Sequence, residues 1–312
     1  MSDKHRRQIT RRLRILVGGS TGLVGTALVD YLRARCHDVV PLARRAPANA
    51  EPHVLWDPAA GKLPVEALDG FDGIVHLGGA NIAHGRWTAE RKRVIRDSRV
   101  VGTRLLCESL ARAAERPDTL VCASAIGYYG SRRDEIMRED ATPGDDFLAE
   151  VAKDWEAATA PAMEAGIRVV NLRIGVVLTP IGAALKSMLL PFRFGLGGRI
   201  GSGGQYMSWV TLDDVVAVID HVIRNESVSG PLNAVAPEPV TNAEFTDTLG
   251  RALHRPTLVP LPAFAVRLLF GEMGQALLLS STRVDSNRLV NSGYHFLYPT
   301  LAGALEDLLK PH

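Results

Sequence analysis

The chain has 312 residues, of which 46% are hydrophobic, and its 36 Lys and Arg residues against 34 Asp and Glu give a net charge of +2. This length and apolar content can fill a large core, and no run approaches the roughly 18 apolar residues that span a bilayer, so a membrane protein is excluded. The balanced charge also excludes a strong field for nucleic acid, so we expect a cytoplasmic protein with a small-molecule substrate and no nucleic-acid or membrane partner.

Basic residues gather at the N-terminus, within residues 4–7 and 11–12. Because this stretch is short and has no apolar h-region, residues 1–12 predict a disordered lead-in. A targeting peptide and a nucleic-acid-binding arm are the alternatives.

An apolar strand that begins at Leu13 runs directly into glycines and then into a helical pattern over residues 26–33. This order is typical of a dinucleotide-binding βαβ unit, in which separate glycines make the tight turn, admit the pyrophosphate and let helix and strand pack. The helix N-terminus would hold the diphosphate with its free amides. An ordinary βα turn without a ligand is the alternative. The expected cofactor contacts are Gly19, Ser20, Thr21, Gly22, Leu23, Val24 and Gly25.

The second predicted strand, residues 38–45, ends in Arg44 and Arg45 with no acidic residue. NAD sites usually place an acid here for the ribose 2′-hydroxyl, whereas NADP sites place arginine for the 2′-phosphate. Guanidinium groups bind phosphate bidentately, so the pair predicts NADP(H). Two solvated arginines at the start of a loop are the alternative.

Strands and helices continue to alternate along the chain, which predicts a parallel sheet covered on both faces. The expected strands are residues 54–56, 73–77, 119–123 and 168–174, and the expected helices are residues 88–115 and 147–165. The sequence therefore predicts an α/β fold of the Rossmann type, with a doubly wound parallel sheet.

After Leu178 the composition changes, and six glycines lie between Phe194 and Gln205. They indicate either a mobile loop over the ligand cleft or a disordered surface loop without a role. Asp213 and Asp214 then begin a helix to residue 224 as N-cap and first-turn charges. Further helices are expected at residues 241–253 and 300–309.

These patterns predict two domains. Residues 13–178 form the NADP-binding Rossmann domain, to which residues 207–224 return. Residues 179–206 and 225–312 form a smaller, substrate-facing domain that lacks a second glycine fingerprint.

The cysteines and histidines predict no metal site. Cys36, Cys107 and Cys122 lie far apart and form no Cys-x-x-Cys pair, so they indicate reduced thiols, mostly buried. His76 lies in an apolar strand and predicts a packed core residue, with a ligand as the alternative.

With these landmarks, the chain resembles the extended short-chain dehydrogenase/reductase superfamily and, more narrowly, its atypical branch of epimerase family proteins. The resemblance extends from Leu13 to Leu309. Its motifs are GGSTGLVG at 18–25, HLGGANI at 76–82, RWT at 86–88, DSRV at 97–100, SAIGYYG at 124–130, DFLAEV at 146–151 with Trp155 and Glu156, RIGVVL at 173–178, GLGGRIGSGGQ at 195–205, MSWVTLDD at 207–214 and APEPVTNAEF at 236–245.

The resemblance implies further cofactor contacts. It places the 2′-phosphate near Arg44, Arg99 within reach of the nucleotide, and residues 175–177 at the nicotinamide end. The other contacts that it implies are Leu77, Gly78, Gly79, Ser124 and Val177.

The chain departs from the superfamily where the reaction occurs. Its working dehydrogenases use a tyrosine and a lysine four residues later, and this chain has no Tyr-x-x-x-Lys. Phe147 and Val151 occupy that spacing. The nearest candidates by position are Ser124, Tyr128 and Lys153, so the catalytic residues stay unassigned.

Two functions follow. The first is an NADP-dependent oxidoreductase or epimerase acting on a small polar or sugar-like substrate, which Gln205, Trp209 and Asn242 favour as expected cleft residues. The second is a non-catalytic NADPH-binding sensor or partner-binding regulator, as division-linked relatives suggest, and the missing tyrosine and lysine favour it.

Overall fold

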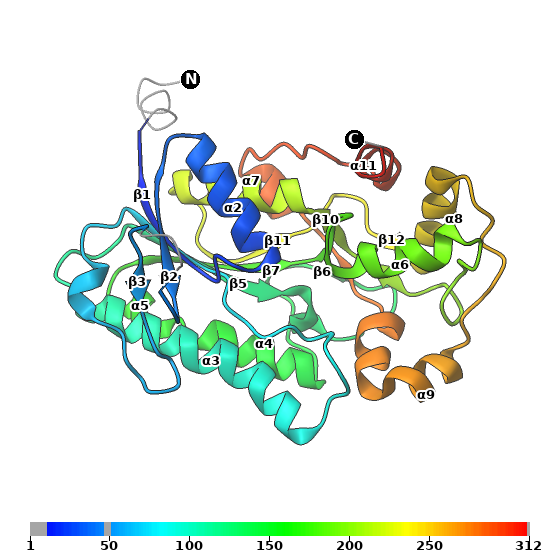
Figure 1. Cartoon of the computed structure of the whole chain (residues 1–312), viewed down its shortest axis with the longest axis horizontal. Coiled ribbons are helices and arrows are strands. Elements are labelled where there is room, and N and C mark those ends of the chain that lie inside the picture. The colour runs from blue at the N-terminus through cyan, green and yellow to red at the C-terminus, as the bar shows by residue number, and fades with distance from the viewer. Residues whose placement is uncertain (1–10, 47–50, 311–312) are drawn as a thin grey trace.

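The centre of the fold is a parallel sheet of seven strands in the order β11-β7-β5-β4-β1-β2-β3 (Figure 1). The computed structural model describes residues 11–46 and 51–310. The strands are β1 (Arg14–Gly18), β2 (Asp38–Ala43), β3 (Val54–Leu55), β4 (Gly73–His76), β5 (Thr119–Ala125), β7 (Arg168–Ile174) and β11 (Gly230–Ala234). The parallel pairing confirms the predicted Rossmann-type α/β fold.

Helices cover both faces of this sheet (Figure 1). On one face lie α2 (Leu23–Ala34) and α7 (Leu212–Arg224), and on the other lie α3 (Ala89–Arg112), α4 (Phe147–Ala157) and α5 (Ala160–Glu164). Successive side chains of a strand point to opposite faces. Ile15 and Val17 of β1 accordingly enter the core beneath α2 and α7, whereas Leu16 enters the core beneath α3.

The helix predicted over residues 147–165 is divided into α4 and α5. Pro161 lies in the first turn of α5, where its missing N–H is tolerated. A continuous helix would need that N–H for the bond to residue 157, so the single-helix prediction was wrong.

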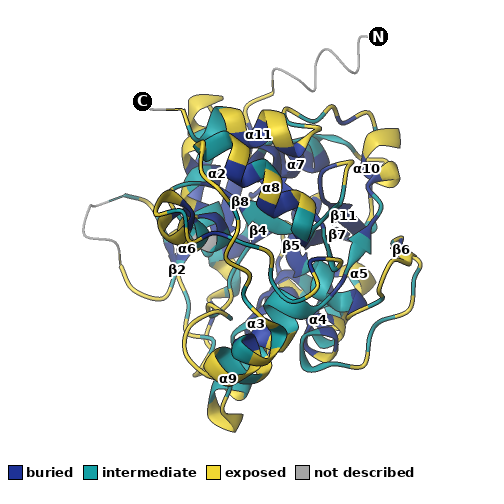
Figure 2. Cartoon of the chain, turned by 90° about the vertical axis from the view of Figure 1, so that its right-hand side faces the viewer, coloured by how far each residue is buried: buried dark blue, intermediate teal, exposed yellow. Residues whose placement is uncertain are grey.

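A smaller lobe lies beyond the carboxyl ends of the central strands (Figures 1 and 2). Its core surrounds the fully buried Trp209 and includes Leu185, Phe245 and Leu305. Its helices are α6 (Ala183–Arg193), α8 (Asn242–Leu253), α9 (Ala263–Gly274) and α11 (Leu301–Leu308), of which α6 and α9 were not predicted.

Short elements connect the lobe to the sheet. Three two-stranded pairs are formed by β8 (Val176–Leu178) with β10 (Trp209–Thr211), β9 (Tyr206–Met207) with β12 (Val240–Thr241), and β6 (Ile136–Met137) with β13 (Arg283–Val284). The remaining helical segments are η1 (Val65–Leu68), η2 (Ile126–Tyr129), η3 (Gln275–Leu279) and α10 (Asn287–Asn291).

One predicted domain boundary requires correction. Residues 225–312 were assigned to the smaller domain, but Gly230–Ala234 form β11 and pair with β7 in the central sheet. Tyr294 also packs in the core beneath α2 and α7. The chain therefore returns to the sheet after α7, because its apolar strand residues find their burial there.

The glycine-rich segment between Phe194 and Gln205 is packed and hydrogen-bonded. The amide of Gly201 donates to the Leu261 carbonyl at 2.9 Å. A Cβ on Gly198 would stand 2.0 Å from the Val259 carbonyl oxygen. Glycine is needed there for close backbone contact, so neither expectation, a mobile loop or a disordered one, describes this segment.

Asp214, in the first turn of α7, binds the segment that follows α10. The cap of α7 is Thr211, so the N-cap role predicted for the acid pair Asp213 and Asp214 was wrong, whereas their predicted place in the first turn is confirmed. The Asp214 carboxylate is fully buried and accepts hydrogen bonds from the Tyr294 hydroxyl and the Leu297 amide, both at 2.8 Å. A buried carboxylate requires such donors, so this residue anchors the C-terminal segment to α7.

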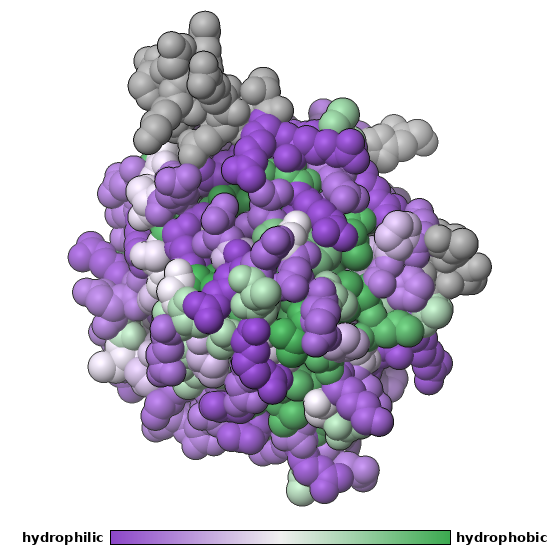
Figure 3. Space-filling model, turned by 90° about the vertical axis from the view of Figure 1, so that its left-hand side faces the viewer, coloured by the Kyte–Doolittle hydropathy of each residue, from purple (hydrophilic) through white to green (hydrophobic). Residues whose placement is uncertain are grey.

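The molecular surface at the end away from the smaller lobe is mostly hydrophilic, with one band of apolar residues (Figure 3). No helix within residues 11–46 and 51–310 is long and apolar enough to cross a membrane. The predicted N-terminal segment lies outside the described residues except for Arg11 and Arg12, and Arg11 pairs with Asp72.

Candidate functional site

The glycine turn joins β1 to α2, and two of its glycines are required by the fold. Gly19 has φ +78°, and a Cβ there would stand 2.8 Å from the Leu77 carbonyl carbon. A Cβ on Gly25 would stand 2.1 Å from the Gly19 carbonyl oxygen. Gly19 therefore makes the turn beside β4, and Gly25 lets α2 approach β1.

Close packing explains the glycine at position 22 less well than the glycines at positions 19 and 25. Its φ of −79° and ψ of 171° are extended, a conformation that other residues also adopt. A Cβ on Gly22 would stand 3.3 Å from the Gly19 carbonyl oxygen, which is close but far less severe than the contacts at Gly19 and Gly25. The residue is exposed, and α2 begins there without a side-chain cap or an acid in its first turn. The arrangement leaves the positive helix end open to an anion.

Arg44 and Arg45 are exposed and follow directly after β2, the neighbour of β1 in the sheet. The nearby acid Glu51 is paired with Arg33 at 3.1 Å. Since parallel strands end at the same edge, the two arginines lie at the edge that carries the glycine turn.

The segment after β4 lies against both the turn and α3. The Leu77 amide donates to the Gly18 carbonyl at 2.8 Å, and the Ala80 amide donates to Ser98 Oγ at 2.9 Å. The Arg99 guanidinium is half-buried beside Gly79, where a Cβ would stand 3.0 Å from its Cζ. Burial, together with the smaller effect of the nearby Arg91 charge, lowers the pKa of Arg99 to about 10.

His76 is completely buried at the end of β4, and both of its ring nitrogens lack a hydrogen-bond partner. Its ring meets Trp56 edge to face at 5.7 Å, and a Cβ on Gly18 would stand 2.7 Å from Nδ1. Burial lowers the pKa of His76 to about 4, which keeps the imidazole neutral. The structure thus places it as a core residue.

Ser124 lies at the end of β5, where its hydroxyl donates to Glu156 Oε1 at 2.6 Å. Arg173, paired with Ser124 in the β5–β7 register, donates to both Glu156 oxygens at 2.8 Å. The Arg173 side chain is only 2% exposed and that of Glu156 13%. Burial alone lowers the pKa of Arg173, but the bonds and charge of Glu156 outweigh it and raise the value.

Two tyrosines contact the same guanidinium. The Tyr128 ring lies 3.6 Å from Arg173 Cζ, in cation–π geometry. The buried Tyr129 hydroxyl accepts from Arg173 Nη1 at 2.9 Å and donates to Asn233 Oδ1 at 2.7 Å. Burial raises the pKa of Tyr129 to about 12, so it holds its proton. Tyr128 is the half-buried member of the pair.

No tyrosine and lysine pair replaces the missing motif among the described residues of α4. The Phe147 ring packs against Trp87 at 5.2 Å, and Val151 is buried. Lys153 is exposed on α4, whereas Glu156 is the α4 residue that reaches Ser124. The structure therefore brings Ser124 and Tyr128 together around Arg173 and leaves Lys153 outside this cluster.

The residues expected in the cleft use their polar groups internally. Gln205 Nε2 donates to the carbonyls of Ile200 and Leu278, each at 3.0 Å. Trp209 is buried, and Asn242 Oδ1 accepts from the Ile200 amide at 2.7 Å. These contacts give the three residues a structural role, and their place in a ligand cleft stays a prediction.

Val177 lies in β8 opposite Val210 of β10, so it is part of the connection to the smaller lobe. Its neighbour Gly175 needs to be glycine, because a Cβ would stand 2.7 Å from the Ser208 carbonyl oxygen. The backbone after β7 is thereby held close to the ends of the central strands.

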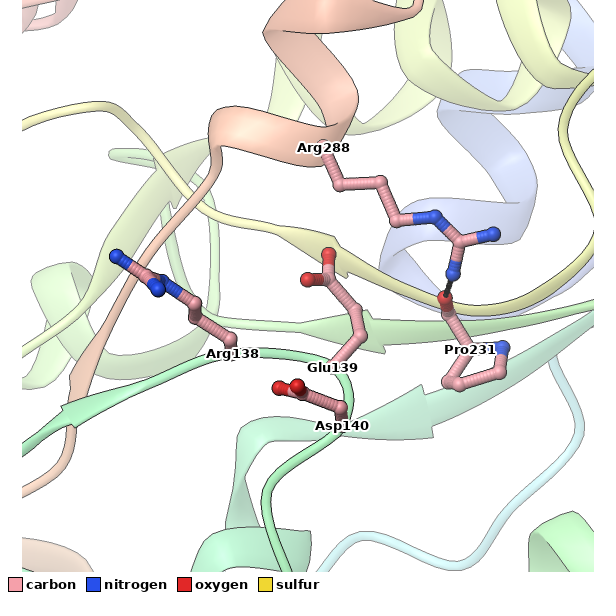
Figure 4. A pocket seen from close by; sticks show the side chains of 5 residues that line it. All are labelled: Arg138, Glu139, Asp140, Pro231 and Arg288. Atoms are coloured by element: carbon pink, nitrogen blue, oxygen red, sulfur yellow. Dashed lines mark hydrogen bonds between the residues drawn. The ribbon is translucent and has the colours of Figure 1, made fainter.

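A surface pocket of about 350 Å³ lies elsewhere, beside the edge strand β11 (Figure 4). Its walls are Arg138, Glu139, Asp140, Pro231 and Arg288. Because β11 is separated from β1 by three strands, this pocket is distinct from the glycine turn. No group of histidine, cysteine or acidic residues that could hold a metal occurs in the part of the chain that the structure describes.

Sequence reasoning did not assign Glu156 and Arg173 a role. A signal was present, since Arg173 lies between Leu172 and Ile174 in a strand of the predicted central sheet, and a charge buried there needs a partner. Its partner lies 17 residues away on a helix and could not be identified without the packing of α4.

Two family models match the chain. The NAD dependent epimerase/dehydratase family matches residues 15–234, which extend from β1 to β11. A domain of unknown function, DUF1731, matches residues 261–308, which contain α9 to α11.

Individual proteins are similar over nearly the whole chain. An epimerase family protein of Mycobacterium bovis is 45% identical over 291 residues, which are 93% of this chain and 96% of that protein. A crystal structure of the human epimerase family protein SDR39U1, isoform 2, with NADPH has a TM-score of 0.87 and 37% identity, covering 95% of this chain and 99% of that one. A nucleoside-diphosphate sugar epimerase from Corynebacterium glutamicum has a TM-score of 0.78 and 35% identity, covering 98% of this chain and 62% of that one.

Proposed function

The chain belongs to the NAD dependent epimerase/dehydratase family, and on that premise we propose that it is an NADP(H)-dependent oxidoreductase or epimerase of the atypical short-chain dehydrogenase/reductase type. Its substrate is small and polar or sugar-like. The cofactor lies along the carboxyl ends of β2, β1, β4 and β5, and hydride chemistry takes place beside Ser124 and Tyr128.

The observation that carries cofactor binding is the difference between Gly22 and its two neighbours in the turn. Gly19 and Gly25 are explained by packing, whereas Gly22 is an exposed glycine with an extended backbone at an uncapped helix N-terminus. Gly22 therefore has no side chain at the place where a pyrophosphate would need the space.

Two observations support NADP(H) over NAD(H). Arg44 and Arg45 follow β2 without an acid, and Glu51 is already paired with Arg33. The human relative was crystallised with NADPH. In this chain an arginine after β2 would bind the 2′-phosphate that distinguishes NADP(H) from NAD(H).

The substrate class is supported by the bacterial relative named a nucleoside-diphosphate sugar epimerase. In this chain two polar residues gather at the end of β5, Ser124 with its hydroxyl on Glu156 and the half-buried Tyr128 with its ring against Arg173. Either group can hydrogen-bond to a substrate hydroxyl or carbonyl. The fold alone does not select among these substrates.

A second function, a non-catalytic NADPH-binding regulator, is favoured by one observation. The Ser124 proton is donated to Glu156, and Tyr129 holds its proton in the core. Within the described residues near Ser124, Tyr128 is then the only remaining candidate for a proton donor of the three predicted from sequence.

Turnover measurements separate the two functions. NADPH absorbance is followed over a panel of carbonyl compounds and sugar nucleotides, and products are analysed by mass spectrometry to detect redox-neutral epimerisation. For an enzyme, we expect Ser124→Ala and Tyr128→Phe to lower turnover about 10²-fold with unchanged NADPH affinity. Lys153→Ala, on the exposed face of α4, is the matched control. Tight NADPH binding without turnover on the whole panel would favour the regulator.

We also propose a reducing, cytoplasmic location. Cys36, Cys107 and Cys122 are all unpaired, as is usual where glutathione and thioredoxin keep thiols reduced. Burial raises the pKa of Cys122 to about 12, so this thiol stays protonated. Immunolocalisation of the full chain tests the location.

A further inference from the structure

Two arginines of α3 lie against the loop that follows β4. Arg91 and Arg99 are eight residues apart, about two helical turns, and share one side of the helix. Arg91 Nη2 donates to the Asn81 carbonyl. Arg99 Nη1 donates to the Ile95 carbonyl at 3.0 Å, and its guanidinium lies beside Gly79. Both cations therefore adjoin residues 79–81.

Neither arginine forms an ion pair with a carboxylate of the described residues. Their neighbours on α3 differ, because Lys92 is 2.6 Å from Glu272 and Arg96 is 2.6 Å from Asp154. Arg91 and Arg99 are half-buried cations without such an acid, and the Arg99 guanidinium lies 5.2 Å from the centre of the Trp155 ring.

The positive charges of Arg91 and Arg99 repel each other, and one N–H donor of Arg91 has no acceptor. The charge of Arg91 adds to burial in lowering the pKa of Arg99. Arg91 Nε is buried and has no hydrogen-bond partner. Like charges away from bulk water raise the free energy of the folded state, and an unpaired buried donor raises it further. A bound anion would offset both costs.

We propose that Arg91 and Arg99 together bind an oxyanion of the phosphate type. Guanidinium groups present planar forks of N–H donors that match phosphate oxygens, and two forks beside one loop hold such a group from two directions. Residue 79 is glycine, so no side chain separates the Arg99 guanidinium from the loop backbone. The chemistry recognised is a phosphate ester or a diphosphate.

Two kinds of ligand contain such a phosphate group, the nucleotide cofactor and a phosphorylated substrate. The loop begins at Leu77, whose carbonyl carbon lies beside Gly19 of the glycine turn, so the diphosphate of a nucleotide is one source. The phosphate of a substrate is the other, and this assignment alone depends on the proposed function. The anion site itself can be tested without any nucleotide.

Calorimetry with inorganic phosphate tests the site in the full-length protein, with chloride at equal ionic strength as the reference. We expect phosphate binding to weaken at least about tenfold in both Arg91→Gln and Arg99→Gln, since a tenfold loss corresponds to about 1.4 kcal/mol. Arg93→Gln, an exposed cation of the same helix, is the matched control. If Arg99→Gln does not fold, Arg99→Lys replaces it in the test. This variant keeps the charge without the planar set of N–H donors, so its phosphate affinity should be intermediate.

Repeating the titration with saturating NADPH separates the sources. Phosphate binding that persists beside NADPH assigns the site to a substrate. Displacement of phosphate by NADPH, together with weaker NADPH binding in both Gln variants, assigns it to the nucleotide. Failure of NADPH to bind would overturn the proposed function and leave the phosphate result intact. Phosphate binding that is absent, or equal in wild type and both variants, together with unchanged NADPH affinity, overturns the anion site.

Discussion

The guanidinium of Arg173 and the carboxylate of Glu156 are joined by two hydrogen bonds of 2.8 Å, one from Nε and one from Nη2. The pair connects β7 to α4 directly below Ser124, whose hydroxyl donates to the same carboxylate at 2.6 Å. A charge buried in this way depends on its partner, because protein is a poor substitute for water around a single ion. The pair therefore controls both the stability of the fold and the orientation of the Ser124 hydroxyl.

Removing one member of this pair should be costly. We expect Arg173→Met to lower the free energy of unfolding by about 3–5 kcal/mol, because the Glu156 carboxylate is left buried and unpaired. Urea unfolding measures the loss. Arg96→Met, which breaks an exposed ion pair with Asp154, should cost no more than about 1 kcal/mol. Equal losses in the two variants would contradict a dominant role for burial.

The exposed arginines after β2 should determine the choice of nucleotide. We expect wild type to bind NADPH more than about tenfold more tightly than NADH, a difference of about 1.4 kcal/mol or more. Arg44→Asp should remove the preference, because a carboxylate repels the 2′-phosphate and accepts from a 2′-hydroxyl. Calorimetry with both nucleotides tests this. Arg251→Asp on α8 makes the same change in net charge at an exposed position, and the prediction is wrong if Arg44→Asp behaves like this control.

Two glycines of the turn should respond differently to substitution. Gly22→Val should melt close to wild type, since its φ of −79° suits other residues, yet lose NADPH binding. Gly25→Ala should destabilise the fold strongly, because its Cβ would stand 2.1 Å from the Gly19 carbonyl oxygen. Thermal melting and calorimetry on each variant provide the comparison. NADPH binding retained by Gly22→Val would show that this glycine is not needed for the ligand.

His76 should make stability fall in weak acid. Its pKa is lowered from 6.5 to about 4 in the folded protein, so below pH 6.5 the unfolded chain takes up a proton that the folded chain does not. The free energy of unfolding is therefore unaffected by His76 above pH 6.5. It falls progressively as the pH is lowered to about 4, by about 3 kcal/mol in total. Urea unfolding of wild type and His76→Gln at several pH values should show a shallower pH dependence in the variant. His84→Gln, at an exposed position, should keep the wild-type slope.

Elements that depend on neighbouring residues were predictable from sequence. The strand before Gly19, the helix after Gly22 and the exposed Arg44 are encoded within a few residues of one another. Alternation of apolar strands and amphipathic helices likewise predicts a parallel sheet covered on both faces, because each element must bury its apolar side. The family resemblance added the segment after β4, whose contacts with a nucleotide remain predictions.

What the sequence determined by itself was therefore the fold class, the glycine turn and the absence of a tyrosine and lysine pair. Only the tertiary structure brought Glu156 to Arg173 and Ser124, placed Arg91 and Arg99 around one loop, and returned β11 to the central sheet. The physical reason is that a strand or helix forms from local periodicity, whereas the ion pair depends on how α4 packs against the sheet, and the arginine pair on how α3 packs against the loop after β4. That packing sets where each side chain points, and no local pattern records it.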